Sequence, residues 1–319
     1  MIKYLRPLAL TMLVASAFTA QAQYSQYSGS GSWGGGDGSR YNASCESGDG
    51  SRQSSSLQIV GLTEDQRLIC FNEKSPVEAR DLGFVSGLMG DVKLIGIDFR
   101  VQDRKMYGVG DKGGIYMIDT RNAAAIKVSQ LTVALVGASF GVDFNPPADR
   151  LRIVSDTGQN LRHNINTTGP GAATTIVDDP LDYPPATPVN AVGPNATGVT
   201  GSAYTNNDLD ATTATTLYAL DTNLDQVAIQ SPPNDGTLAA TGKLTIDANS
   251  SVGFDIYSTI RNGVTVAVQS LASLQTTDSA GNLASSLFSV SLPTGKATSR
   301  GSFSVRNKVI GIAIPLNQL

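Results

Sequence analysis

The chain has 319 residues, and its 23 Lys and Arg against 27 Asp and Glu give a net charge of −4. Nucleic acids and anionic membranes both reward clustered Lys and Arg, so an acidic chain of this kind is a poor candidate for either ligand. With two cysteines, one histidine and no CxxC sequence, the chain lacks the ligands of a Cys/His zinc site.

The first residues have the pattern of an export signal. Lys3 and Arg6 precede an apolar run at residues 8–20, and the sequence A-Q-A follows at residues 20–22. Basic residues, a short apolar run and an A-x-A sequence are typical of a secretory signal peptide. The run is shorter than a membrane-spanning helix requires. We therefore expect residues 1–22 to be a signal peptide and the mature chain to be periplasmic or extracellular, without a transmembrane segment.

A change in composition divides the rest of the chain. Residues 23–56 are rich in Ser and Gly and poor in aliphatic residues, which predicts a flexible tether. Residues 57–319 contain short β-rich runs and form one predicted domain. Cys45 and Cys70 lie on either side of this boundary. In an oxidising compartment they are expected to pair; alternatively, Cys70 is a buried strand residue and Cys45 is unpaired.

A short phrase returns along the predicted domain, as LIGIDFR, FGVDFN, VTGSAY, SVGFDI and VIGIAI. Its glycines are separated by 45, 60, 52 and 58 residues. Repeats of this length indicate units that bury their apolar faces against neighbouring units. Each interval holds four strand-like runs, as in IGIDFR, KMYGVG, GIYMID and IKVSQLTV, and in GFDIYS, GVTVAV, LFSVSL and ATSRGSF. Four strands per unit match one blade of a β-propeller.

The two ends of the domain indicate how many blades there are. The N-terminal part offers three runs, QIVGLT, RLICFN and ARDLGFV, before Gly96 begins a new unit. The C-terminal part supplies one extra strand at residues 309–316. Pairing that strand with the incomplete blade closes the ring and removes unpaired sheet edges. The sequence therefore predicts an all-β fold, a five-bladed β-propeller of four-stranded blades closed by pairing of the C-terminal strand with the N-terminal blade.

The repeated phrase also suggests a site on the channel axis. Asp98, Asp143 and Asp255 occupy the same position of three first strands, and Ala203 and Ala313 take that position in the other two. First strands line the channel of a propeller, so the three carboxylates should converge, and converging carboxylates could hold Ca²⁺. Alternatively, each Asp accepts hydrogen bonds from the backbone of a neighbouring blade. No other cofactor is expected.

Polar residues near the ends of strands are candidates for ligand binding, because propeller ligands usually bind where loops converge. The candidates are Asn145, Arg152, Asn160, Arg162 and Asn206. The alternative role for the asparagines is turn formation. His163 is the single histidine, so any Ser-His-Asp triad would have to be built on it. A lone histidine on a strand is usually a surface or packing residue, and no catalytic triad is predicted.

Several long strings carry a family resemblance: GIDFR, GVDFNPPADRLRIVSDTGQNLRHN, AYTNN, TLYALD and QSPPNDGTL. Together they resemble the bacterial domain-of-unknown-function family numbered 4394, over residues 57–316. This resemblance implies an exported, propeller-like domain and implies no activity.

We accordingly expect an exported, non-catalytic binding or scaffold module of the cell envelope or exterior, which recognises a protein or a glycan and no nucleic acid. One alternative is a Ca²⁺-dependent hydrolase or lyase that uses the three carboxylates at the channel mouth. Another is an extracellular matrix or surface component attached through its tether. The fold by itself does not decide between them.

Overall fold

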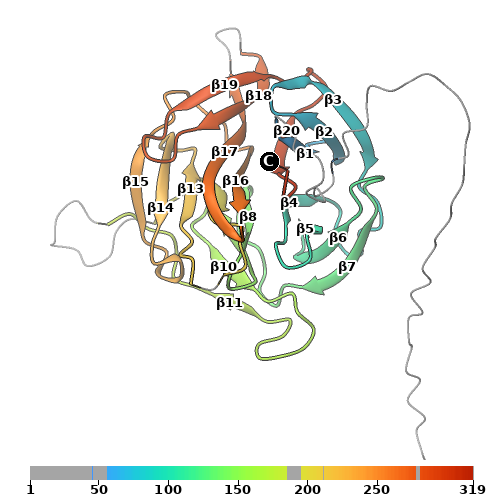
Figure 1. Cartoon of the computed structure of the whole chain (residues 1–319), viewed down its shortest axis with the longest axis vertical. Helices are drawn as coiled ribbons and strands as arrows, with labels where there is room; N and C mark the ends of the chain where they lie inside the picture. Colours follow the sequence, from blue (N-terminus) through green and yellow to red (C-terminus); the bar gives the residue numbers. More distant parts are fainter. Residues whose placement is uncertain (1–44, 46–55, 185–194, 211, 278–280, 319) are drawn as a thin grey trace, which may run out of the picture. The chain divides into compact units, whose positions relative to one another are not determined.

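The twenty strands of the computed structural model form five four-stranded antiparallel sheets, which follow one another around a ring (Figure 1). The structure describes residue 45 and residues 56–184, 195–210, 212–277 and 281–318. The predicted signal peptide, and the predicted tether apart from residues 45 and 56, lie outside these residues. Among the described residues, no helix is long and apolar enough to cross a membrane.

Each sheet is one blade, and its strands follow one another from the channel outward. Blade 1 contains β20 (Val309–Ala313), β1 (Gln58–Thr63), β2 (Arg67–Asn72) and β3 (Ser75–Phe84). Blade 2 contains β4 (Leu94–Phe99), β5 (Met106–Gly110), β6 (Gly114–Ile118) and β7 (Ala125–Gln130). Blade 3 contains β8 (Phe140–Asn145), β9 (Arg150–Ser155), β10 (Asn160–His163) and β11 (Thr175–Val177). Blade 4 contains β12 (Val199–Tyr204), β13 (Leu217–Asp221), β14 (Gln226–Gln230) and β15 (Leu238–Lys243), and blade 5 contains β16 (Val252–Arg261), β17 (Val264–Thr277), β18 (Leu283–Val290) and β19 (Ala297–Ser302).

The ring closes within blade 1. Strand β20 pairs antiparallel with β1, with Leu62 opposite Gly311 and Val60 opposite Ala313. Gln318 strengthens this closure, because its side-chain amide accepts a hydrogen bond from the backbone N–H of Gln58 (2.7 Å) and donates one to the carbonyl of Gln58 (2.9 Å). The predicted five-bladed propeller and its closure by the C-terminal strand are confirmed.

The apolar core is divided among the junctions between blades. One cluster of buried side chains lies at each of the five junctions in the described part of the chain. The junction of blades 2 and 3, for example, packs Val109 and Ile115 against Phe144 and Leu161. Middle strands are therefore buried on both faces, which is why they read as continuous apolar runs such as RLICFN. No blade buries its apolar surface alone.

The cysteine pair is bridged. Cys45 and Cys70 form a disulfide with a Cα–Cα distance of 5.9 Å, and both side chains are buried. The bridge ties residue 45 to β2, the third strand of blade 1 from the channel. Of the two alternatives for these cysteines, pairing is confirmed.

Blade 5 differs from the prediction in one respect. The run GVTVAV was expected to be its second strand, but β17 extends from Val264 to Thr277, and β18 pairs only with its second half, from Leu271 onward. No turn-forming residue separates GVTVAV from the following SLASLQTT, so the two segments form one strand. Leu271, Ala272 and Leu274 are buried, which places the second half in the blade. The first half of β17 pairs with β16 and extends the β16–β17 hairpin beyond the blade.

Candidate functional site

The five glycines of the repeated phrase lie at the narrowest part of the channel, where the cavity between the inner strands has a volume of about 20 Å³. Four of them closely face the inner strand of the next blade, whereas a Cβ atom at Gly311 would lie 3.6 Å from Leu62 of its own blade and 3.7 Å from Ile97 of the next. A Cβ atom at Gly253 would lie 2.5 Å from the nitrogen of Ile312, and one at Gly141 would lie 2.7 Å from the nitrogen of Ser202. These approaches are too close for any side chain, so glycine allows the inner strands to pack around the axis. The remaining space is about that of one water molecule.

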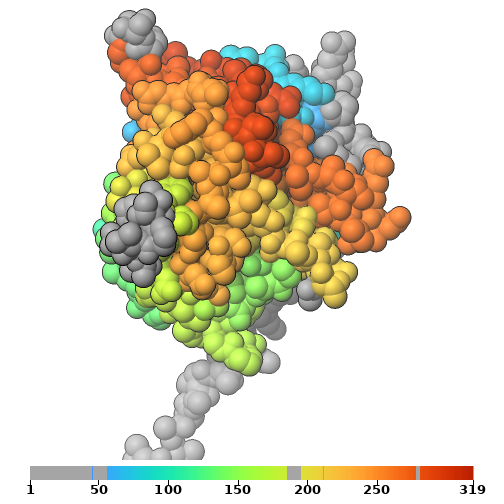
Figure 2. Space-filling model, turned by 90° about the vertical axis from the view of Figure 1, so that its left-hand side faces the viewer, coloured from blue at the N-terminus to red at the C-terminus, as the bar shows by residue number. Residues whose placement is uncertain are grey.

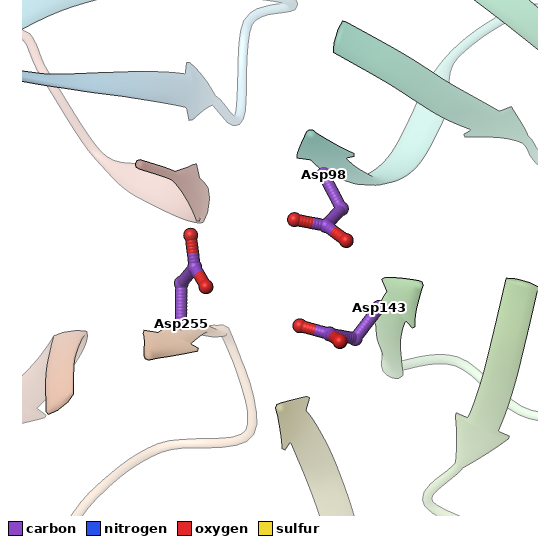
Figure 3. A group of neighbouring side chains, drawn as sticks. All are labelled: Asp98, Asp143 and Asp255. Carbon is purple, nitrogen blue, oxygen red and sulfur yellow. The ribbon is translucent and has the colours of Figure 1, made fainter. Parts of the chain in front are cut away.

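Two residues beyond the glycines, three inner strands bring Asp98, Asp143 and Asp255 together (Figure 3). Each offers a carboxylate oxygen, and these atoms all lie within 4.8 Å of one another. All three side chains are buried. The structure therefore brings together the three residues that the sequence singled out for the channel.

Each of these carboxyl groups also joins two blades. Asp98 accepts a hydrogen bond from the backbone N–H of Phe144 in blade 3 (2.7 Å), and Asp143 accepts one from Tyr204 in blade 4 (3.2 Å). Asp255 accepts one from Ile314, directly after β20 of blade 1 (2.6 Å). The three side chains thus have the interblade contacts expected of a structural role.

Burial and mutual repulsion control the charge of this group. Burial raises the pKa of Asp255 to about 6. The pKa of Asp98 is raised well above its usual value by burial and by the nearby charge of Asp255, and that of Asp143 by burial and by the charges of Asp98 and Asp255. Three carboxylates at this separation cannot all stay ionised unless a cation neutralises them. Protons or a bound metal ion would relieve this repulsion.

The three carboxyl groups are the type of ligand that a hard cation prefers, but three are fewer than such a cation usually has. Carboxylate oxygens are preferred ligands of Ca²⁺, but this ion takes six to eight oxygens. Alanine stands at the equivalent position of blades 1 and 4, at Ala313 and Ala203. Additional oxygens would have to come from second carboxylate oxygens, backbone carbonyls or water.

The channel opens at two mouths. The first mouth, where the inner strands begin, holds a cavity of about 150 Å³ lined by groups that include Glu64, Lys93 and Ser251. The second mouth, where the inner strands end, holds a larger cavity of about 530 Å³. Its lining comes from the segments after β4, β12 and β20 and from the β16–β17 turn: Val101, Gln102, Asp103, Arg104, Asn207, Asp208, Leu209, Asp210, Ile260, Gly263 and Asn317.

The second mouth offers charged, amide and apolar groups. Arg104 and Asp210 are exposed, and Leu209 is 61% exposed. Asp103 is held by an ion pair with Arg100 (3.0 Å). Asp208 is buried and accepts a hydrogen bond from the hydroxyl of Thr265 (3.1 Å), which fastens the β16–β17 hairpin to the loop after β12. A ligand in this cavity would meet both donors and acceptors beside an apolar side chain.

The predicted ligand-binding residues fall into two groups. Asn145 ends β8 and Asn206 follows β12, at the same end of the inner strands as the second mouth, but neither lines its cavity. The Asn145 carboxamide accepts a hydrogen bond from the backbone N–H of Ala148 (3.2 Å), and the Asn206 carboxamide donates one to the carbonyl of Ala214. Both side chains are therefore engaged in local turns.

The other three candidates meet on the two middle strands of blade 3, β9 and β10. Arg152 forms an ion pair with Asp178 (2.6 Å) in which both side chains are 4% exposed. Asn160 accepts a hydrogen bond from Arg152 (2.7 Å), and Arg162 forms a second ion pair with Asp178 (2.9 Å). The structure brings these three residues together but does not join them to Asn145 or Asn206. A role of all five in ligand binding stays a prediction.

His163 is buried between blades 2 and 3. Its Nε2 lies 2.8 Å from the hydroxyl of Ser129 on β7, and its Nδ1 lies 3.0 Å from the hydroxyl of Thr175 on β11. Burial lowers its pKa to about 4. The ring is neutral at pH 7 and bridges two blades.

The solved structures to which this chain is similar resemble it only distantly. A structural genomics protein of unknown function from Bacteroides thetaiotaomicron is 14% identical, with a TM-score of 0.36 over 79% of this chain and 62% of that protein. An auxiliary nutrient binding protein from Bacteroides ovatus is 13% identical, with a TM-score of 0.35 over 75% of this chain and 57% of that protein. The chain thus spans less than two thirds of either protein, and these likenesses carry no argument about its function.

None of the curated proteins matches this chain. The model of one family does match, over residues 67–313, and this family is described as a domain of unknown function (DUF4394). The match runs from β2 of blade 1 through the strand that closes the ring and so includes all five inner strands. On this evidence the chain belongs to the DUF4394 family.

Proposed function

We propose that this chain is an exported, non-catalytic binding module whose ligand occupies the second mouth. The observation that carries this proposal is the cavity of about 530 Å³, to which four blades contribute. Its volume is within the range of roughly 300 to 1,000 Å³ that is typical of ligand pockets. The lining combines a cation, carboxylates, amides and aliphatic side chains, a mixture that suits a polar segment of a protein or a glycan.

Filling the cavity tests the proposal. Leu209 lines the cavity and is 61% exposed, so Leu209→Trp should occupy ligand space without disturbing the core. Leu224→Trp is the matched control, because Leu224 is 45% exposed between β13 and β14 and lies outside the cavity lining. Printed arrays of oligosaccharides and of peptides identify what the wild-type chain binds. We expect Leu209→Trp to weaken that binding at least tenfold and the control to leave it unchanged; equal binding by all three proteins would place the site elsewhere.

Export remains part of the proposal, and residues 1–22 support it by their signal-peptide pattern. N-terminal sequencing of the protein recovered from outside the cytoplasm should begin at Gln23. The two other functions expected from the sequence find less support. A hydrolase or lyase would need the channel carboxylates to reach a substrate, whereas Asp98, Asp143 and Asp255 are buried and bonded to backbone. A matrix component would depend on the tether, residues 23–56, which lies outside the described part of the chain apart from residues 45 and 56.

We infer a second candidate function, cation binding on the channel axis, from the 4.8 Å grouping of Asp98, Asp143 and Asp255. A bound Ca²⁺ would neutralise the mutual repulsion of the carboxylates. A ligand that binds the native state alone stabilises it by about 2.7 kcal/mol at a hundredfold excess over Kd. Ca²⁺ should therefore raise the melting temperature of the wild-type protein.

The double variant Asp98→Asn with Asp143→Asn should abolish this shift, whereas Asp210→Asn, at an exposed carboxyl group, should retain it. No effect of millimolar Ca²⁺ on the wild type would leave the carboxyl groups as interblade hydrogen-bond acceptors that hold protons. A shift that survives in the double variant would place the cation elsewhere, for example at the turns around residues 178–179 or 208–210.

A further inference from the structure

The β16–β17 hairpin extends beyond blade 5 and carries a free sheet edge. The first residue of β17 that pairs with β18 is Leu271, opposite Ser289. Residues 264–270 pair with β16 on one side, except at Val266, where the register shifts. Among the described residues, no strand pairs with them on the other side. We call these residues the β17 arm. In Figure 2 a lobe in the orange of this part of the chain stands out at the right-hand side of the molecule.

The β17 arm lacks the charges that usually protect a sheet edge. Sheet edges attract other strands, and proteins blunt them with charged residues, short strands or bulges. The long outer strands of the other edges all carry charge, as Arg80 on β3, Lys127 on β7, Lys243 on β15 and Arg300 on β19. The sequence of the arm is VTVAVQS, without a charged residue, a proline or a glycine. Its one irregularity is a register shift against β16, on the side that is already paired.

Exposed valines accompany this edge. Val264, Val266 and Val268 are between 44% and 54% exposed. Polar contacts hold the arm to neighbouring blades, because Thr265 donates to Asp208 of blade 4 (3.1 Å) and Gln269 donates to the carboxylate of Glu73 in blade 1. The arm is therefore an anchored segment of strand, and its apolar side chains and free backbone groups are available to a partner.

We propose that the β17 arm pairs with the β17 arm of a second copy of this chain and forms a symmetric dimer. In a two-fold dimer the same patch meets itself, and antiparallel strands related by a two-fold axis can pair edge to edge. Each arm offers free backbone groups with which the other can pair and exposed valines that the other can cover. The net charge of −4 opposes contact between two copies, but the arm is neutral, so no like charges are opposed along the shared edge. Because the arm stands out from the molecule, the acidic groups of the second mouths need not be pressed together.

Light scattering after size-exclusion chromatography tests the dimer. The purified full chain should elute with about twice the mass of one chain, and dilution should shift it toward the monomer. Val266→Lys with Val268→Lys places charges along the shared edge and should give a monomer that keeps the wild-type circular dichroism spectrum. Its melting temperature should no longer depend on protein concentration. The matched control, Val77→Lys with Val305→Lys, alters valines that are 60% and 99% exposed and should remain dimeric.

Crosslinking keeps the proposal testable if the lysine variant fails to fold. A single cysteine introduced as Ala267→Cys or Val268→Cys should give a disulfide-linked dimer on a non-reducing gel, since paired antiparallel strands hold their Cα atoms within disulfide distance. Val305→Cys should not. A wild-type chain that is monomeric at every concentration, or a dimer that persists in the Val266→Lys, Val268→Lys variant, would overturn the proposal. In the monomeric case the arm would be open to a strand of a different protein.

Discussion

His163 illustrates how a single residue links stability to pH. An unperturbed histidine has a pKa near 6.5, and burial lowers that of His163 to about 4. The unfolded chain therefore binds a proton that the folded chain excludes between these values. The stability that this residue contributes is complete above pH 6.5 and is lost as the pH falls toward 4, by up to about 3 kcal/mol.

The variant His163→Gln should remove this pH dependence, because glutamine can bond to the Ser129 and Thr175 hydroxyls but does not titrate. The buried carboxyl group of Asp255 works in the opposite direction, since a pKa of about 6 means that the folded chain gains stability as the pH falls from 6 toward 4. The informative quantity is thus the difference in free energy of unfolding between variant and wild type, measured by urea denaturation from pH 4 to 7. A difference that does not change with pH would contradict the assignment.

Among the elements, the inner strands were the easiest to predict from the sequence. Each contains its own glycine and, in three blades, an aspartate two positions later, so the pattern is visible within six residues. Closure of the ring was predictable because one incomplete unit and one extra strand can satisfy each other. These features depend on local sequence or on simple strand pairing.

Other features depend on contacts that local sequence does not contain. Arg152 lies on β9 and pairs with Asp178, which directly follows β11. The burial of Arg152 therefore could not be predicted from its own strand, RLRIVS. The second mouth is built by segments of different length that share no phrase, and this explains why Arg104, Leu209 and Asn317 were missed. A search of the residues that follow each inner strand would have found them. The length of β17 was missed for a similar reason. How much of β17 joins the blade depends on its partner strand β18, which pairs with it only from Leu271 onward.

The inner strands also offer a matched pair of substitutions. At Gly253 an added Cβ would lie 2.5 Å from the nitrogen of Ile312, whereas at Gly311 the nearest atom, on Leu62, is 3.6 Å away. Gly253→Ala should therefore force two inner strands apart and lower the free energy of unfolding by about 3 kcal/mol. Gly311→Ala should change it by less than about 1 kcal/mol. Urea denaturation measures both, and equal effects would show that close packing around the axis does not limit stability.

At the scale of the whole molecule, stability depends on a closed cycle of blade junctions. Each of the five apolar clusters joins two neighbouring blades, and β20 contributes to the junctions on both sides of blade 1: Ile312 packs in the cluster with blade 5, and Ala313 in the cluster with blade 2. Loss of this one strand would open the cycle and expose the edge of β1.

Deletion of residues 309–319 should consequently give an aggregated protein rather than a smaller folded one, because unpaired edges and two open apolar faces favour association. Size-exclusion chromatography of the refolded material, together with its thermal unfolding curve, checks this outcome. A truncated chain that is monomeric and melts at the wild-type temperature would show that the closure of the ring contributes little. Substitution of Gln318 by Ala, which removes one hydrogen-bonding side chain and keeps β20, is the milder control.

The pairing of β1 with β20 also sets an order of events during synthesis. The ribosome makes β1 first and β20 last, about 250 residues later, and at typical translation rates this interval lasts roughly 10 to 50 seconds. Until then blade 1 has three strands, and a nascent chain has no route to the complete ring. Under the proposed export such a delay would be useful, because secretion machinery that transports unfolded chains would receive one that has not yet been able to close.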